Sequence, residues 1–87
     1  INNNNILFHF LKLNILNNLI MAKIQLNGRK RVVGNKLSML NLLKKYKIDS
    51  KKVAVELNGS IVNKNKYRSI YLKDKDKVEI VHFIGGG

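Results

Sequence analysis

The stretch Val53-Ala-Val-Glu-Leu-Asn-Gly-Ser-Ile-Val62 predicts a β-hairpin and decides the fold. Apolar side chains recur at every second position of Val53–Leu57, which is the pattern of a strand with one buried face. Asn58-Gly59 follows, and this dipeptide favours the tight turn whose two central residues both have positive φ. Residues 60–63 then return as a short second strand.

The same pattern occurs earlier in the chain. Ala22–Asn27 alternates, Asn27-Gly28 is a second tight-turn signal, and Lys30–Gly34 returns, so we expect another hairpin. A helix follows, because Ser38 can cap a helix N-terminus and the apolar residues of Met39–Tyr46 recur at helical spacing.

The last third of the chain supplies one further strand. Lys64–Ser69 is polar and predicts one helical turn, Leu72–Lys77 reads as a charged turn, and Val78–Ile84 reads as the final strand. Strand runs around one helix indicate an α+β fold. We therefore expect a mixed sheet of about five strands packed on one main helix.

The final strand has two distinct faces. Val78 and Ile80 fall on one face, and Val81 and Phe83 fall on the other. If the first pair faces the helix, Val81 and Phe83 form an apolar patch on the open side of the sheet. We expect this patch to dock a partner; ordinary scattered surface hydrophobics are the alternative.

The chain ends in Gly85-Gly86-Gly87. A frayed end is one interpretation. The other is a thin tail without Cβ atoms that carries its terminal carboxylate into a narrow channel of another protein. Transfer of AMP from ATP would activate that carboxylate as an acyl-adenylate, and a sulfide or persulfide could then displace AMP and leave a thiocarboxylate. The partner must supply the ATP site, because the Gly28–Arg31 turn lacks phosphate-loop spacing.

Composition limits the other options. A chain of 87 residues without a long linker predicts one domain, and the absence of cysteine excludes disulfides and thiolate ligands. His9 and His82 stand far apart, so we expect no metal site. A net charge of +12 is compatible with compositional bias toward lysine, with an acidic protein partner or with nucleic acid. Because basic and aromatic residues are not interleaved along one strand, we expect no nucleic-acid partner.

Residues 1–20 differ from the rest: they hold seven asparagines, no acid and one base, Lys12. They match neither a secretory signal nor a presequence, and their apolar run is too short for a membrane span. We expect Met21 to be the native start and residues 1–20 to be a non-native or disordered extension, in which a short helix from Leu7 to Leu19 can form. A weak targeting or surface-binding segment is the alternative.

The segments Val53–Val62, Tyr67-Arg68 and Leu72–Gly87 together resemble the ThiS family of sulfur carrier proteins of thiamine biosynthesis. The resemblance covers about residues 21–87 and implies a ubiquitin-like β-grasp domain at 21–84 with a flexible glycine tail at 85–87. It also implies a carrier and not an enzyme, with Gly87 as the sulfur-carrying end and Gly86 and Gly85 as its narrow approach.

The resemblance further implies the partners. A ThiF-like adenylyltransferase would use ATP on Gly87, a sulfur donor enzyme would form the thiocarboxylate, and a ThiG-like thiazole synthase would accept the sulfur. We expect no bound cofactor, no membrane partner, a monomer when free, and a cytoplasmic location, with the plastid stroma as the alternative. Two other functions stay open: a sulfur carrier for molybdopterin synthesis, and a ubiquitin-like protein modifier.

Overall fold

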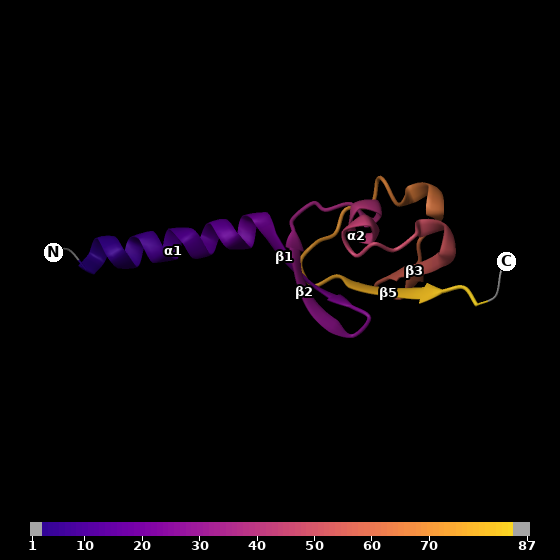
Figure 1. Cartoon of the computed structure of the whole chain (residues 1–87). Coiled ribbons are helices and arrows are strands. Elements are labelled where there is room, and N and C mark those ends of the chain that lie inside the picture. Colours follow the sequence, from indigo (N-terminus) through magenta and orange to yellow (C-terminus); the bar gives the residue numbers. More distant parts are fainter. Residues whose placement is uncertain (1–2, 85–87) are drawn as a thin grey trace.

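Two hairpins and a final strand form one five-stranded sheet in the computed structural model, which describes residues 3–84 and, within the first helix, the side chains of residues 5–15 and 20. The first hairpin joins β1 (Met21–Leu26) to β2 (Arg29–Gly34), and the second joins β3 (Val53–Leu57) to β4 (Ser60–Ile61). Strand β5 (Lys77–His82) lies between them, parallel to β1 and antiparallel to β3 (Figure 1). The order β2-β1-β5-β3-β4 is the mixed sheet that the sequence predicted.

Both hairpins turn at the expected asparagine–glycine pairs. The φ angles are 48° at Asn27 and 81° at Gly28, and 52° at Asn58 and 86° at Gly59. Positive φ at both central positions matches the right-handed twist of the flanking strands. The turns therefore fix the register of each hairpin locally.

Helix α2 (Met39–Lys45) covers one face of the sheet (Figure 1). The Oγ atom of Ser38 accepts a hydrogen bond of 3.1 Å from the backbone N–H of Asn41, which is the predicted N-terminal cap. Two short 3-10 turns complete the element order: η1 (Ser50–Lys52) and η2 (Lys64–Lys66). The second is the helical turn expected in the polar stretch after β4.

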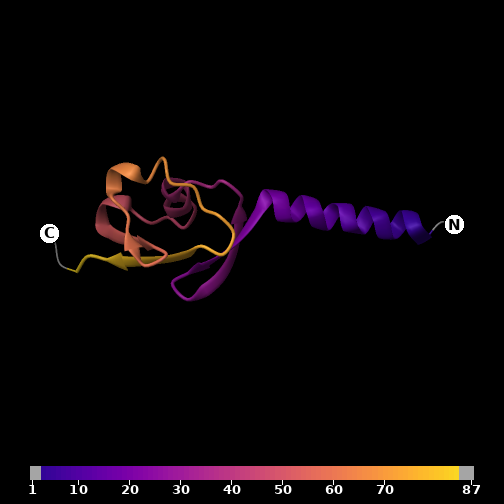
Figure 2. The ribbon, with the colours of Figure 1, turned by 180° about the vertical axis from the view of Figure 1, so that it is seen from behind.

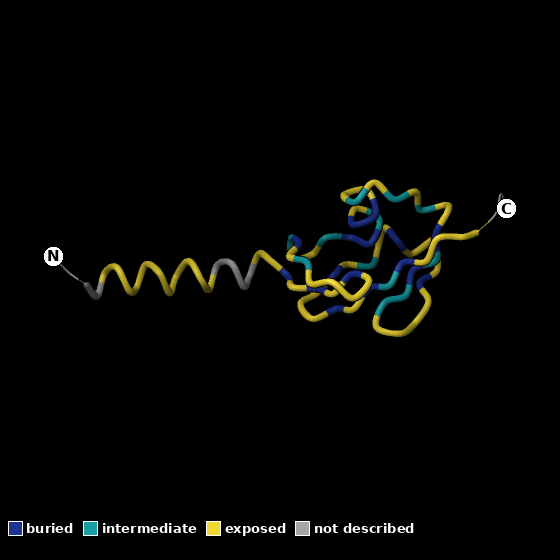
Figure 3. The backbone as a smooth tube through the Cα atoms, turned by 60° about the horizontal axis from the view of Figure 1, so that its bottom comes forward, coloured by how far each residue is buried: buried dark blue, intermediate teal, exposed yellow. Residues whose placement is uncertain are grey.

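The core lies between α2 and the sheet. Every second residue of β1 is buried, and Figure 3 shows burial concentrated inside the domain. The buried apolar side chains are Ala22, Ile24, Leu26, Val33, Met39, Leu42, Leu43, Val53, Val55, Val62, Tyr67, Leu72, Val78 and Ile80.

The Leu72–Lys77 segment is not the simple charged turn that the sequence predicted. Leu72 is fully buried and Asp76 is only 5% exposed. The two carboxylate oxygens of Asp76 accept hydrogen bonds from the backbone N–H of Lys73 and from the side chain of Asn58. These donors replace water, which is why a charged residue can be buried there.

Two strands also end two residues earlier than predicted, and the other differences in strand bounds are of one residue. The return strand ends at Ile61, although the backbone N–H of the buried Val62 still donates to the carbonyl of Val55 at 2.8 Å. The last strand ends at His82 and not at Ile84, since only its residues up to His82 pair with β3.

Helix α1 (Asn3–Ile20) precedes the domain and is longer than the helix expected at Leu7–Leu19. Its described side chains are all exposed, and it projects away from the sheet at the end opposite to the end of β5 (Figure 1, Figure 2). The molecule is consequently 66 Å long but only 23 and 22 Å across. No helix within residues 3–84 has the length and hydropathy to cross a membrane. The expectation that residues 1–20 are not native stays a prediction.

Candidate functional site

Strand β5 has one buried face and one exposed face, as the sequence predicted. Val78 and Ile80 are buried under α2, whereas Val81 is 60% and Phe83 is 55% exposed. The exposed pair belongs to the last described part of the chain before the tail, and the three glycines 85–87 lie outside the described residues. The faces are thus confirmed, and the docking role of Val81 and Phe83 stays a prediction.

The residues just before the tail are anchored through Phe83. Its backbone N–H donates a 2.9 Å hydrogen bond to the carbonyl of Lys52, beyond the end of the β3–β5 ladder. The ammonium of Lys64 lies 5.0 Å from the centre of the Phe83 ring and donates to the carbonyl of Lys51 at 3.3 Å. Ile84 is fully exposed. Among residues 3–84, the contacts that hold the chain on the sheet therefore end at residue 83.

An open groove of about 400 Å³ lies beside Phe83. Tyr67 lines it and is only 2% exposed, and its hydroxyl has no hydrogen-bond partner among residues 3–84. Burial raises the pKa of this hydroxyl above its ordinary value. The other lining residues are Val53, Ala54, Ile61, Val62, Asn63 and Lys64. Sequence reasoning missed this groove, because Tyr67 stands in a polar stretch with no periodic signal.

Two glutamates lie opposite each other on the open face of the sheet. Glu56 of β3 pairs with Glu79 of β5, and Ile61 of β4 pairs with Glu56 from the other side. Residues that are directly opposite in a ladder project from the same face. Sequence reasoning missed this pair too; the signal was one glutamate in the middle of each of two alternating strands.

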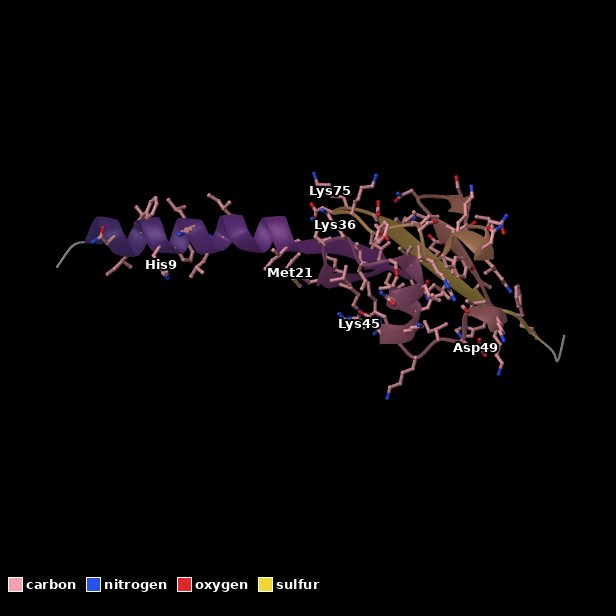
Figure 4. The ribbon with its side chains drawn as sticks, turned by 90° about the horizontal axis from the view of Figure 1, so that it is seen from above. His9, Met21, Lys36, Lys45, Asp49 and Lys75 are labelled. Carbon is pink, nitrogen blue, oxygen red and sulfur yellow. The ribbon has the colours of Figure 1, made fainter. Side chains whose placement is uncertain are left out.

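Basic side chains surround the domain and are not gathered at one site. In Figure 4, Lys36 and Lys75 lie on one side and Lys45 on the other. His9 lies on α1, away from the domain (Figure 4). Within the described part of the chain, no three histidine, cysteine, aspartate or glutamate side chains are placed to hold a metal ion.

Comparison with known proteins adds to this geometry. The model of the ThiS family matches residues 16–87. The sulfur carrier protein ThiS of Bacillus subtilis is 41% identical over 68 residues, which are 74% of this chain and 98% of that protein. The chain thus covers nearly the full length of the Bacillus subtilis protein.

A thiazole synthase of Paramagnetospirillum magneticum is 45% identical over 65 residues, but this chain spans only 20% of that protein's length. The crystal structure of a thiamine biosynthesis protein, ThiS, from Geobacter metallireducens superposes with a TM-score of 0.67 at 32% identity, covering 75% of this chain and 99% of that one. The sheet order, the single covering helix and these matches agree with the β-grasp fold predicted from the sequence. The chain belongs to the ThiS family.

Proposed function

We propose that this chain is a sulfur carrier of thiamine biosynthesis and that the carboxylate of Gly87 carries the sulfur. The observation that carries the proposal is the match to the Bacillus subtilis sulfur carrier across 98% of that protein. The match to the ThiS family model extends to residue 87 and so includes the three glycines. A carrier of this kind is a substrate of other enzymes and has no catalytic residues of its own.

The chemistry proceeds in two displacements at the terminal carboxyl group. A carboxylate oxygen of Gly87 attacks the α-phosphorus of ATP, and pyrophosphate leaves. Hydrosulfide then adds to the acyl carbon, AMP leaves, and a thiocarboxylate remains. A ThiF-like adenylyltransferase would hold ATP and orient the reacting groups.

The domain supports this role because it presents the C-terminal glycines at the end of an anchored strand. Phe83 is tied to Lys52, while Ile84 is fully exposed, so the anchored strand ends close to the reactive terminus. Val81 and Phe83 offer apolar area beside this exit, where an activating enzyme could bind the domain and receive Gly85, Gly86 and Gly87 in its channel.

A thiazole synthase is the proposed acceptor of the sulfur. Support comes from the Paramagnetospirillum magneticum thiazole synthase, in which a segment one fifth of the protein's length resembles this chain. A carrier and an acceptor joined in one polypeptide would meet at a high effective concentration. We further propose a reducing compartment, the cytoplasm or a plastid stroma, which a chain without cysteine permits.

The test is enzymatic conversion of the full chain. Incubation with a ThiF-type adenylyltransferase, ATP and sulfide should raise the intact mass by the difference between one sulfur and one oxygen, located at the C-terminus by fragmentation. A chain that lacks Gly87 should stay unchanged. Conversion of the truncated chain, or attachment of the intact chain to lysines of other proteins, would overturn the proposal.

A further inference from the structure

Glu56 has an unusual position for a carboxylate in so basic a chain. It lies directly opposite Glu79, and like charges at opposite positions of a ladder destabilise a sheet. The chain has 17 basic residues and only five acidic ones, so two of its few acids stand side by side.

The other acids already have partners. Asp49 accepts from the backbone of Lys51, Asp74 accepts from the backbone of Lys23, and Asp76 accepts from Lys73 and Asn58. Glu79 pairs with Lys77 at 3.2 Å, although both side chains stay about half exposed. Within residues 3–84, the carboxylate of Glu56 has neither an ion pair nor a hydrogen bond.

Apolar side chains lie on one side of this pair on the open face, and Lys77 lies on the other side, next to Glu79. Val81 is opposite Ala54, one step along the face from the glutamates, and Ile61 is opposite Glu56 and 75% exposed. Helix α2 covers the other face of the sheet, so no element within the described chain covers this one (Figure 1). An apolar surface with two adjacent carboxylates at its edge is complementary to an apolar surface with one cation at its edge.

We propose that this face, defined by Ala54, Glu56, Ile61, Glu79 and Val81, binds an arginine of the enzyme that adenylates Gly87, with apolar side chains beside that arginine. The inference rests on the proposed function. Arginine fits better than lysine, because its planar fork can donate to two carboxylates at once, whereas an ammonium is a point charge.

The adenylating enzyme is the appropriate partner because this face lies a short length of chain away from Gly87. Gly87 follows Val81 by six positions, and an extended chain spans at most about 3.6 Å per residue, or roughly 20 Å. An enzyme with Gly87 in its active site therefore contacts or closely approaches this face. The positive charge of the whole chain attracts an acidic partner at long range, and the local negative pair then sets the orientation of docking.

The test compares two variants of the full chain that change the net charge equally. The double variant Glu56→Gln, Glu79→Gln should raise both the Kd for a ThiF-type enzyme and the KM in ATP-dependent pyrophosphate release by about tenfold or more. The control Asn41→Lys, Asn65→Lys adds the same two charges at exposed positions outside this face and should leave both values within about twofold. The thermal midpoint of the glutamine variant should not fall, since a like-charge contact is removed.

Each result decides a different claim. If the wild-type chain is not adenylated at all, the proposed function fails and this inference fails with it. If the wild-type chain reacts and the glutamine variant matches it in Kd and KM, or if the control weakens binding equally, only this inference is overturned. An arginine-selective dicarbonyl reagent, used with saturating ATP, should label one arginine fewer on the enzyme in its complex with the wild-type chain than in its complex with the glutamine variant. Equal labelling would show that no arginine of the enzyme binds this face.

Discussion

The side-chain amide of Asn58 donates a 3.0 Å hydrogen bond to the carboxylate of Asp76, 18 residues further along the chain. The carbonyl of the same amide accepts from the backbone N–H of Lys77 at 2.8 Å, and the carbonyl of Lys77 accepts from the backbone of Asn58 at 2.7 Å. The turn of the second hairpin is therefore fastened to the start of β5. This contact places the strand that precedes Gly85-Gly86-Gly87.

Replacing Asp76 by alanine should lower the free energy of unfolding by about 2–3 kcal/mol, because the backbone N–H of Lys73 and the amide of Asn58 both lose a charged acceptor in a buried place. Urea denaturation of the full chain measures the change. Asp49→Ala is the control: that exposed carboxylate caps only η1, so its loss should cost about 1 kcal/mol or less. Equal effects of the two changes would show that Asp76 does not fasten β5.

Asn27 should tolerate glycine better than alanine, although both changes destabilise. Its side-chain oxygen accepts from the backbone N–H of Ile80 at 2.7 Å, so either change loses this bond, at about 1 kcal/mol. Alanine must also adopt the φ of 48°, which adds about 1 kcal/mol, whereas glycine adopts it freely. Thermal denaturation of both variants ranks their stabilities. An alanine variant as stable as the glycine variant would contradict the turn geometry.

Tyr67→Phe should leave stability unchanged or raise it by up to about 1 kcal/mol at neutral pH, because the buried hydroxyl has no partner among the described residues. Burial raises the pKa of Tyr67, so its folded form favours the neutral phenol. Its contribution to stability is full below the unfolded pKa of about 10 and is lost as pH rises toward the folded pKa.

Urea denaturation below and above about pH 10 tests the sign, since the phenylalanine variant should lose less stability than wild type across that interval. Tyr71→Phe is the matched control, because Tyr71 is exposed. The free energy of unfolding of this variant should follow that of wild type at both pH values. An identical pH response of the Tyr67 variant and wild type would contradict the burial of the hydroxyl.

Val81→Lys should raise the KM for adenylation by about tenfold or more without loss of thermal stability. It places a cation beside Glu56 and Glu79, where it would compete with the arginine of the enzyme, and it lies in the proposed docking face and not in the core. Val32→Lys is the matched control. Val32 is also exposed, and its pairing with Lys23 places it on the same sheet face in β2, the edge strand two strands away from β5. Unfolding of the Val81 variant, or equal kinetic effects of both changes, would contradict the assignment.

The local elements follow from sequence alone because their causes are local. The Asn27-Gly28 and Asn58-Gly59 turns, the Ser38 cap and the alternation of Val53–Leu57 each depend on residues a few positions apart. Such signals predict the two hairpins and the helix before any packing is known. The alternation of the last strand likewise predicted that Val81 is exposed.

Only the tertiary structure decided the contacts between distant segments. Leu72, Tyr67 and Asp76 stand in polar stretches, and their burial depends on Leu37, Asn58 and other partners brought near by the fold. The opposition of Glu56 and Glu79 depends on the register of β3 against β5, and a shift of one residue would change both the partner and the face. The sequence therefore determined that the chain ends in a thin glycine tail after an alternating strand. The structure decided what lies beside that strand, because side-chain burial and strand register are set by long-range packing.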